Sequence, residues 1–197
     1  LPAEGIIVPL MPGQSISAKY QVVRHLGGSV YLGEDSASQS PCAIKAIRHF
    51  KLEEFMAENY LLARLNHPCV PLVRDLTVED GVCYLVSDYI NGSSLAELTD
   101  RPSAEEVVRL AVEALEPLEF LHGLNPPTVH GDVKPANLIR QKGTQNLVLV
   151  GLGLARSSDP QAVRSVYAPP EQVAGRREAG HDLYAVGVIM HQLLSGL

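Results

Sequence analysis

One short polar stretch constrains the fold of this chain more than any other. It reads Val129-His130-Gly131-Asp132-Val133-Lys134-Pro135-Ala136-Asn137-Leu138. A carboxylate stands at Asp132, an amine follows two residues later at Lys134, and a carboxamide five residues later at Asn137. Phosphoryl transfer from a nucleotide needs these groups close together, as a base for the attacking hydroxyl, a cation for the transferred group and a metal ligand. We therefore expect a loop at the mouth of a cleft, held between buried segments.

The composition is that of an ordinary globular protein. The chain has 197 residues, 46% of them hydrophobic and 19% charged, and a net charge of −6. An acidic balance without a basic stripe argues against a nucleic-acid partner. No apolar run reaches the length of a membrane span, and the N-terminus lacks a signal pattern. We expect no membrane span in this segment and a cytoplasmic location.

The cysteines and histidines predict no metal centre of their own. Cys42, Cys69 and Cys83 lie among apolar neighbours without paired spacing, so we expect reduced core thiols. The seven histidines show no metal-ligand spacing. The chain starts at Leu1 and stops at Leu197 within a helical pattern, so we expect a fragment.

The first half of the chain reads as a linker followed by strands. Residues 1–18 contain three prolines, all before residue 13, and show no periodicity, which predicts a linker. Residues 19–26 and 29–35 read as strands joined by a two-residue turn at Gly27-Gly28, where positive φ is needed. Further strands are expected at residues 42–45, 70–76 and 82–86.

Helical periodicity appears in three places. Residues 52–65 carry one apolar stripe. A longer helix starts after Ser103, which forms a capping box with Glu106, and Pro117 is expected to kink it. A short buried strand is expected at residues 147–150, and the last helical pattern contains Asp182.

Read together, these segments resemble the bacterial eukaryotic-like Ser/Thr protein kinases. The resemblance runs from Tyr20 to Leu197 and includes the polar stretch, a hinge-like segment Tyr84 to Leu95, the anchor Tyr167-Ala168-Pro169-Pro170-Glu171 and the helix that starts near His181. It implies an α+β, two-lobed protein-kinase-like fold. The N-lobe would span residues 19–90 and a partial C-lobe residues 91–197, truncated after the helix that contains Asp182. Asp182 would brace the catalytic loop.

The resemblance also assigns roles to individual residues. Asp132 would be the catalytic base, beside Lys134, and Asn137 a metal ligand. Lys45 would bind phosphates and pair with Glu58, with Glu53 and Glu54 as alternatives. The backbone at the hinge would bind adenine, with a small gatekeeper. The nucleotide-binding set implied by the family is Leu26, Val30, Ala43, Lys45, Ser87, Asp88, Ile90 and Leu138.

Four positions depart from the family pattern. Gly131 stands where most members have Arg, and Gly27-Gly28-Ser29 is about four residues shorter than the glycine-rich loop that covers the phosphates. Gly151 replaces the Asp that is the principal magnesium ligand. Arg164 replaces a Thr that braces the catalytic Asp, with Ser165 one place off.

These departures lead to three functional hypotheses. The first is a pseudokinase or severely impaired kinase that acts as a regulatory or binding module with a protein partner, with ATP binding possible and magnesium binding weak or absent. The second is an active ATP-dependent Ser/Thr kinase with atypical metal dependence. A weaker third hypothesis is a small-molecule phosphotransferase, which His130-Gly131-Asp132 suggests and which Lys134 and the Ala-Pro-Pro-Glu segment disfavour.

Overall fold

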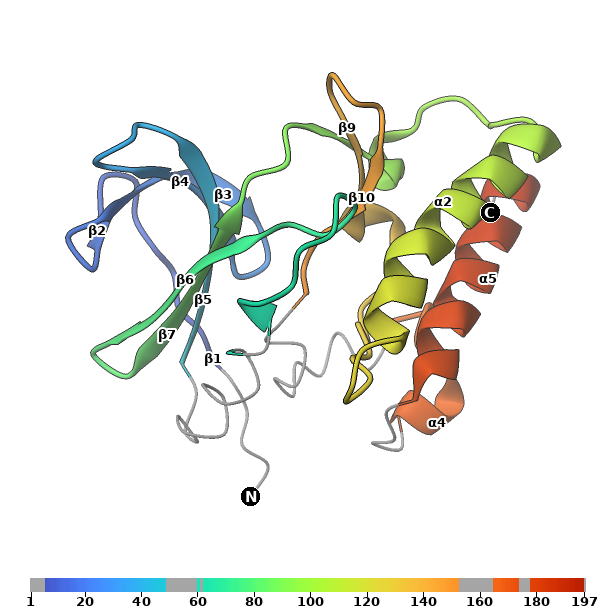
Figure 1. Ribbon diagram of the computed structural model, residues 1–197. Coiled ribbons are helices and arrows are strands. Elements are labelled where there is room, and N and C mark those ends of the chain that lie inside the picture. Colours follow the sequence, from blue (N-terminus) through green and yellow to red (C-terminus); the bar gives the residue numbers. More distant parts are fainter. Residues whose placement is uncertain (1–5, 49–59, 61, 153–164, 174–177, 197) are drawn as a thin grey trace. The chain divides into compact units, whose positions relative to one another are not determined.

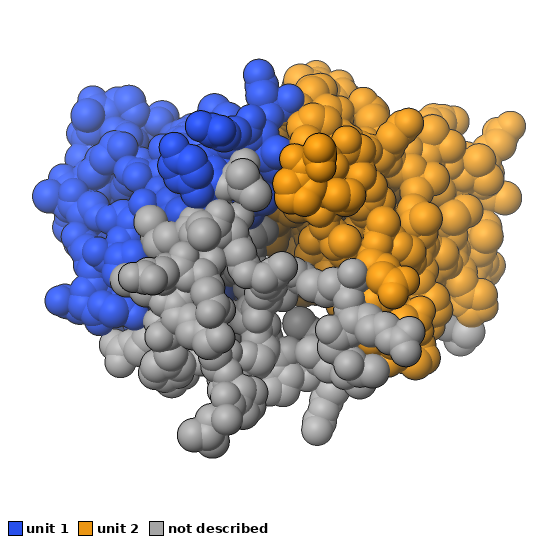
Figure 2. All heavy atoms as spheres, turned by 60° about the horizontal axis from the view of Figure 1, so that its bottom comes forward, with its two compact units in different colours: residues 1–66, 71–89, 156–158 blue, residues 67–70, 90–155, 159–197 orange. Residues whose placement is uncertain are grey.

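The computed structural model describes residues 6–48, 60, 62–152, 165–173 and 178–196. The chain divides into two compact units, which Figure 2 colours separately. Unit 1 comprises residues 1–66, 71–89 and 156–158, and unit 2 comprises residues 67–70, 90–155 and 159–197. The main division falls between Tyr89 and Ile90, next to the hinge predicted near Asp88.

Unit 1 is built on one antiparallel sheet (Figure 1). Its strands are β1 (Ile6–Ile7), β2 (Ser15–Ile16), β3 (Tyr20–Gly27), β4 (Val30–Asp35), β5 (Pro41–Arg48), β6 (Val73–Glu79) and β7 (Val82–Asp88). The order across the sheet is β2-β3-β4-β5-β7-β6, and β1 pairs with the end of β5. The predicted strands are therefore present, with β6 and β7 each ending later than expected.

Side-chain alternation along β5 separates the two faces of this sheet. Cys42, Ile44 and Ala46 are fully buried in a core cluster that also contains Tyr31. Burial raises the pKa of the Cys42 thiol to about 11, as expected for a core cysteine. Because side chains alternate along a strand, the intervening Ala43 and Lys45 point to the opposite face.

The segment expected to be a linker contributes to unit 1. It contains β1 and β2, and Leu10 is only 6% exposed within the core cluster. The backbone N–H of Leu10 donates to the Tyr31 hydroxyl at 3.1 Å. Strands of two residues are too short to show alternation in a sequence, which is why the pattern did not reveal them.

The first hairpin turns one residue later than predicted. Gly27 is paired with Val30, so the two-residue turn is Gly28-Ser29. A register irregularity between His25 and Gly27 shifts the pairing. Gly28 has φ +54°. The Nε2–H of His25 donates a hydrogen bond to the Gly28 carbonyl oxygen at 2.9 Å. The connection between the strands is as short as expected.

Unit 2 combines a small sheet with two long helices. Its elements are β8 (Gly92–Ser94), η1 (Leu95–Glu97), α2 (Ala104–His122), η2 (Pro135–Asn137), β9 (Leu138–Gln141), β10 (Leu147–Leu149), α4 (Pro170–Val173) and α5 (Ala179–Ser195). The sheet order is β10-β9-β8, and α2 packs along α5 (Figure 1). The capping box between Ser103 and Glu106 is present, and α2 continues through Pro117.

Some expectations fall partly or wholly outside the described residues. Of the helix predicted at residues 52–65, the structure describes Tyr60 and residues 62–65 only. Among the residues that the structure describes, no helix is long and apolar enough to cross a membrane.

Candidate functional site

The polar stretch forms a loop whose two ends are tied to the same residue, Val150. The His130 ring is fully buried, and its Nε2–H donates to the Val150 carbonyl at 3.1 Å. Its other nitrogen, Nδ1, accepts from the backbone N–H of Asp132 at 3.3 Å. At the far end of the loop, the Val150 N–H donates to the Asn137 carbonyl at 2.8 Å. These bonds hold Gly151, the next residue, beside the loop.

A buried carboxylate from α5 fixes the backbone of the loop. Asp182 is 1% exposed and accepts three hydrogen bonds. One oxygen accepts from the His130 N–H at 2.9 Å and from His122 Nε2 at 2.8 Å, and the other accepts from the Gly131 N–H at 2.7 Å. Because a buried carboxylate needs such partners, the bracing role predicted for Asp182 has a direct geometric basis.

Two of the three polar groups predicted to act together, Lys134 and Asn137, contact the third, Asp132. Lys134 Nζ lies 2.7 and 3.0 Å from the two carboxylate oxygens of Asp132. Asn137 Nδ2 donates to the Asp132 backbone oxygen at 2.7 Å and to its carboxylate at 3.0 Å. Both oxygens of the carboxylate are thus held by donors, which fixes its orientation. An oriented carboxylate can accept the proton of a hydroxyl group.

Gly151 lies against the Asn137 carboxamide. It has φ +88°, a conformation that residues with side chains rarely adopt. A Cβ atom at this position would lie 3.2 Å from Asn137 Nδ2 and 3.3 Å from its Cγ. A side chain at residue 151 would therefore project directly beside Asn137, and the glycine leaves that space without any ligand group.

In unit 1, four of the predicted nucleotide-binding residues share one face of the sheet. Val30 lies opposite Lys45, and Ser87 lies opposite Ala43, in directly paired positions. Cross-strand partners point to the same side of a sheet, so these residues form one surface. Leu26, on the irregular end of β3, is 38% exposed. The Lys45 side chain is half-buried.

The hinge residues close β7 and begin unit 2. The N–H of Asp88 donates to the Leu72 carbonyl at 2.9 Å, and its carboxylate accepts from Arg74 Nε at 2.7 Å. Ile90 begins the second unit. The Asp88 side chain is therefore engaged within the sheet, and the adenine contact of the hinge backbone stays a prediction.

Comparison with known proteins identifies the fold family. The family described as the protein kinase domain matches residues 20–197, which is most of the chain. This chain belongs to the protein kinase family. A solved structure, the kinase domain of PknI from Mycobacterium tuberculosis, is similar with a TM-score of 0.76 and 25% identity, covering 96% of this chain and 78% of that one. The two-lobed kinase-like fold with a sheet-rich N-lobe is thereby confirmed.

Curated relatives are bacterial Ser/Thr kinases. The chain is 31% identical to Serine/threonine-protein kinase B of Synechocystis, over 92% of this chain and 37% of that protein. It is 29% identical to Serine/threonine-protein kinase PrkC of Bacillus subtilis, over 95% of this chain and 32% of that protein. The chain thus spans about a third of the length of these relatives. The expected kinship with bacterial Ser/Thr kinases is confirmed.

One predicted nucleotide contact does not fit the structure. Leu138 is 1% exposed and lines a small apolar cavity between α2 and α5. Its side chain belongs to the core of unit 2, so it cannot contact a ligand outside that core. The next residue, Ile139, is half-buried and lies on the other face of β9 because of strand alternation. Side-chain alternation along residues 138–141 could have shown that Leu138 faces the core. Only one of the adjacent residues Leu138 and Ile139 can face it.

Kinases of this fold use ATP with magnesium, and the described residues do not fit the metal. Magnesium needs several oxygen ligands, usually with one or two carboxylates. At the expected position Gly151 has no side chain, and the Asp132 carboxylate is already bound by Lys134 and Asn137. Within the described residues, no group of three or more His, Cys, Asp or Glu residues could hold a metal ion. Among the described residues of the catalytic loop and at residue 151, Asn137 is the one predicted metal ligand that remains.

Several predicted residues lie outside the described part of the chain. These are Glu58, Glu53, Glu54 and Arg164, together with most of the segment that follows Gly151. Ser165 is described, and it lines a small cavity together with Asp132. Its hydroxyl accepts from the Tyr167 N–H at 3.3 Å. Two residues outside the predicted set also border the loop. His181 lines the same cavity, and Gln172 Nε2 donates to the Gly131 carbonyl at 2.8 Å.

Proposed function

We propose that this protein kinase domain is a pseudokinase or a severely impaired Ser/Thr kinase that works as a regulatory or binding module. The observation that carries this proposal is Gly151, which lies beside Asn137 where a second metal ligand is needed. A glycine cannot supply an oxygen from its side chain. The remaining groups hold the loop and its carboxylate in place, but they do not assemble a magnesium site.

The size of the expected defect follows from the chemistry of phosphoryl transfer. The reaction depends mainly on positioning and on electrostatic stabilisation of the transferred group. Removal of one preorganised stabilising group lowers rates by roughly 10²–10³. The Gly28-Ser29 turn has too few backbone amides to lie over a triphosphate, so poor positioning lowers the rate further.

The groups that remain are compatible with nucleotide binding. Val30, Ala43, Lys45 and Ser87 present one surface of the unit 1 sheet, and a lysine amine binds phosphate oxygens. We propose that ATP can bind here with little dependence on magnesium. The partner of such a module would be a protein, consistent with the protein kinases to which the chain is similar.

The alternative is an active Ser/Thr kinase with atypical metal dependence. The geometry of the catalytic loop favours it, because Asp132 is oriented by both Lys134 and Asn137. Asp132 would then accept the proton of the acceptor hydroxyl, and Lys134 would stabilise the transferred phosphoryl group. Three features argue against this alternative. They are Gly151 in place of a metal ligand, the short turn in place of the phosphate lid, and Arg164 in place of the usual Thr.

Transfer of labelled phosphate from ATP separates the two proposals. The wild-type protein and the Asp132→Asn variant are compared with generic protein acceptors, with magnesium or manganese and with a metal chelator. For an impaired kinase we expect incorporation that is indistinguishable between the two proteins. Incorporation by the wild type that Asp132→Asn abolishes would show an active kinase and would retire the pseudokinase proposal.

A further inference from the structure

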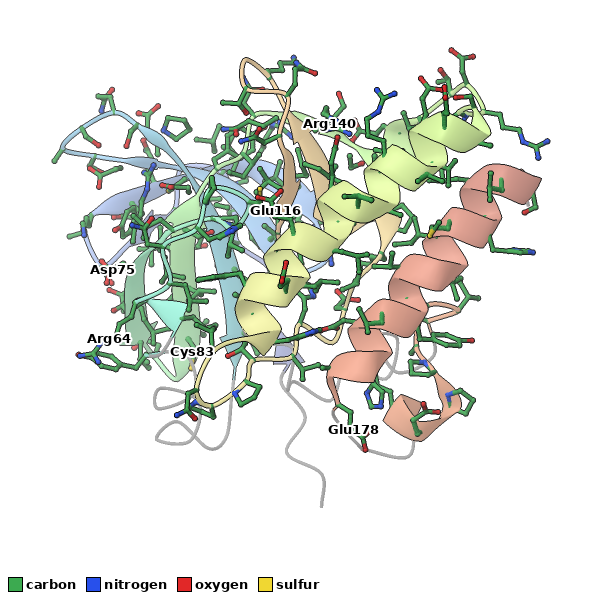
Figure 3. All side chains as sticks on the ribbon, turned by 45° about the vertical axis from the view of Figure 1, so that its right-hand side comes forward. Arg64, Asp75, Cys83, Glu116, Arg140 and Glu178 are labelled. Atoms are coloured by element: carbon green, nitrogen blue, oxygen red, sulfur yellow. The ribbon has the colours of Figure 1, made fainter. Side chains whose placement is uncertain are left out.

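Unit 2 contains one buried donor that is not satisfied within the described part of the chain. His181 lies in the first turn of α5 and is 3% exposed, yet its Nε2 has no hydrogen-bond partner among the described residues. The other ring nitrogen, Nδ1, accepts from the backbone N–H of Glu178 at 3.4 Å; Glu178 is labelled at the start of α5 in Figure 3. Because Nδ1 accepts, the proton of the neutral ring belongs on Nε2. A buried N–H without a partner is unfavourable, so this donor calls for an acceptor.

A small cavity lies beside this ring. Its volume is about 10 Å³, which is close to the room that one water molecule needs. The catalytic loop, the segment before α4 and the start of α5 all line it. The lining residues that carry polar side chains are Asp132, Ser165, Tyr167, Gln172, His181 and Asp182.

The chemistry of the lining selects the ligand. The His181 N–H is a donor, so the ligand must offer an acceptor atom. Two residues with carboxylates, Asp132 and Asp182, line the same space, which disfavours an anion. A bare cation cannot accept a hydrogen bond. Water is a neutral acceptor of this size. Water can also donate two hydrogen bonds, and the residues that line the cavity offer acceptors in the Ser165 hydroxyl and the Gly131 carbonyl.

We propose that this cavity is a binding site for a single water molecule, and that His181 is a positioning residue for Asp132. The water accepts from His181 Nε2–H and donates to the catalytic loop and to the segment that contains Ser165. It thus connects α5 to the loop at a second point, beside the bonds that Asp182 makes to the same backbone. The site does not depend on whether the protein transfers phosphate.

The first test uses the wild-type protein in solution. Long-range ¹H–¹⁵N spectra of histidine-labelled protein identify which ring nitrogen of His181 carries the proton, with assignment from the His181→Gln spectrum. We expect the Nε2–H tautomer. We also expect a rotating-frame Overhauser cross-peak between that proton and water, with the sign of a dipolar contact and not the opposite sign that chemical exchange gives. A ring protonated at Nδ1, or an Nε2–H without a dipolar cross-peak to water, would overturn the proposal.

The second test compares two substitutions at His181. His181→Gln keeps a donor at similar reach, whereas His181→Leu removes it; exposed His191 on the same helix gives matched controls as His191→Gln and His191→Leu. We expect His181→Leu to lower Tm by about 2–4 °C beyond its control and to shift the amide resonances of Gly131 and Asp132. His181→Gln should restore most of both. If the cavity is dry, His181→Leu removes an unsatisfied donor, and an unchanged or raised Tm would contradict the proposal.

Discussion

The catalytic loop of this domain differs from the positions where metal and phosphate binding were predicted. At the loop, Asp132 contacts both Lys134 and Asn137. Asp182 accepts two hydrogen bonds from the loop backbone and one from the His122 ring. Gly151 in unit 2 has no side chain to offer a metal, and the Gly28-Ser29 turn in unit 1 has few backbone amides to offer a phosphate. The contacts within the loop are present, whereas the metal and phosphate contacts predicted at these two places lack these groups.

The difference shows which residues the fold itself requires. Asp182 is buried, so its removal leaves several N–H groups without partners and destabilises unit 2 whether or not a reaction occurs. A metal ligand at residue 151 satisfies no buried donor, so its loss leaves the fold intact. A complete catalytic loop is therefore weak support for catalysis, since the fold depends on the same contacts.

The largest effect is expected from Asp182→Ala, which breaks the complete region. The N–H groups of His130 and Gly131 and the ring N–H of His122 would lose a buried acceptor. At about 1–3 kcal/mol for each unsatisfied donor, the loss should be about 3 kcal/mol or more in the free energy of unfolding. Urea unfolding measures it.

Asp100→Ala is the control for this variant. Asp100 is exposed, so its replacement should change stability by no more than about 0.5 kcal/mol. If Asp182→Ala lost less than about 1 kcal/mol, the claim that the fold itself requires the loop contacts would be wrong.

Gly151→Asp adds the carboxylate that we propose a metal site would need, and it is expected to have the next largest effect. Because Gly151 has φ +88° and a Cβ would lie 3.2 Å from Asn137, both Gly151→Asp and the matched Gly151→Ala should lose about 1–2 kcal/mol. Only the Asp variant should gain a magnesium-dependent rise in Tm with ATP. If neither variant responds to magnesium, the missing carboxylate is not what prevents metal binding.

The smallest effect is expected at the turn that replaces the phosphate lid. Gly28 has φ +54°, and an added Cβ would meet nothing within 4 Å, so only backbone strain opposes a side chain there. Gly28→Ala should lose about 1 kcal/mol, and Gly28→Asn less, since Asn tolerates this conformation. Thermal unfolding measures both. If Gly28→Ala and Gly28→Asn lost equal stability, the positive φ that the pairing of Gly27 with Val30 imposes on residue 28 would not be what opposes a side chain there.

Much of the fold could be predicted because its signals are local. The strand expected at residues 42–45 and the capping box at Ser103 were predicted from the sequence and were confirmed. Leu10 was missed because its burial depends on strands far along the chain. The turn was placed one residue early because the irregularity after His25 reflects pairing with β4 rather than any residue preference.

The candidate site was predictable in part. The spacing of Asp132, Lys134 and Asn137 is a sequence property, and their mutual contacts follow from it. Leu138 was misassigned because a motif gives adjacency but not the face of the strand. His181 could not be identified from its neighbours in sequence, since the cavity beside it is formed by three separate segments.

The most direct test of the central claim is the response of Tm to ATP with and without magnesium. The protein is titrated with ATP in magnesium and in EDTA, with magnesium alone as the control. Because a ligand at 100 times its Kd adds about 2.7 kcal/mol, cooperative metal binding would be readily detected. We predict the same nucleotide-induced shift in both conditions, and a further rise that requires magnesium and ATP together would contradict the account.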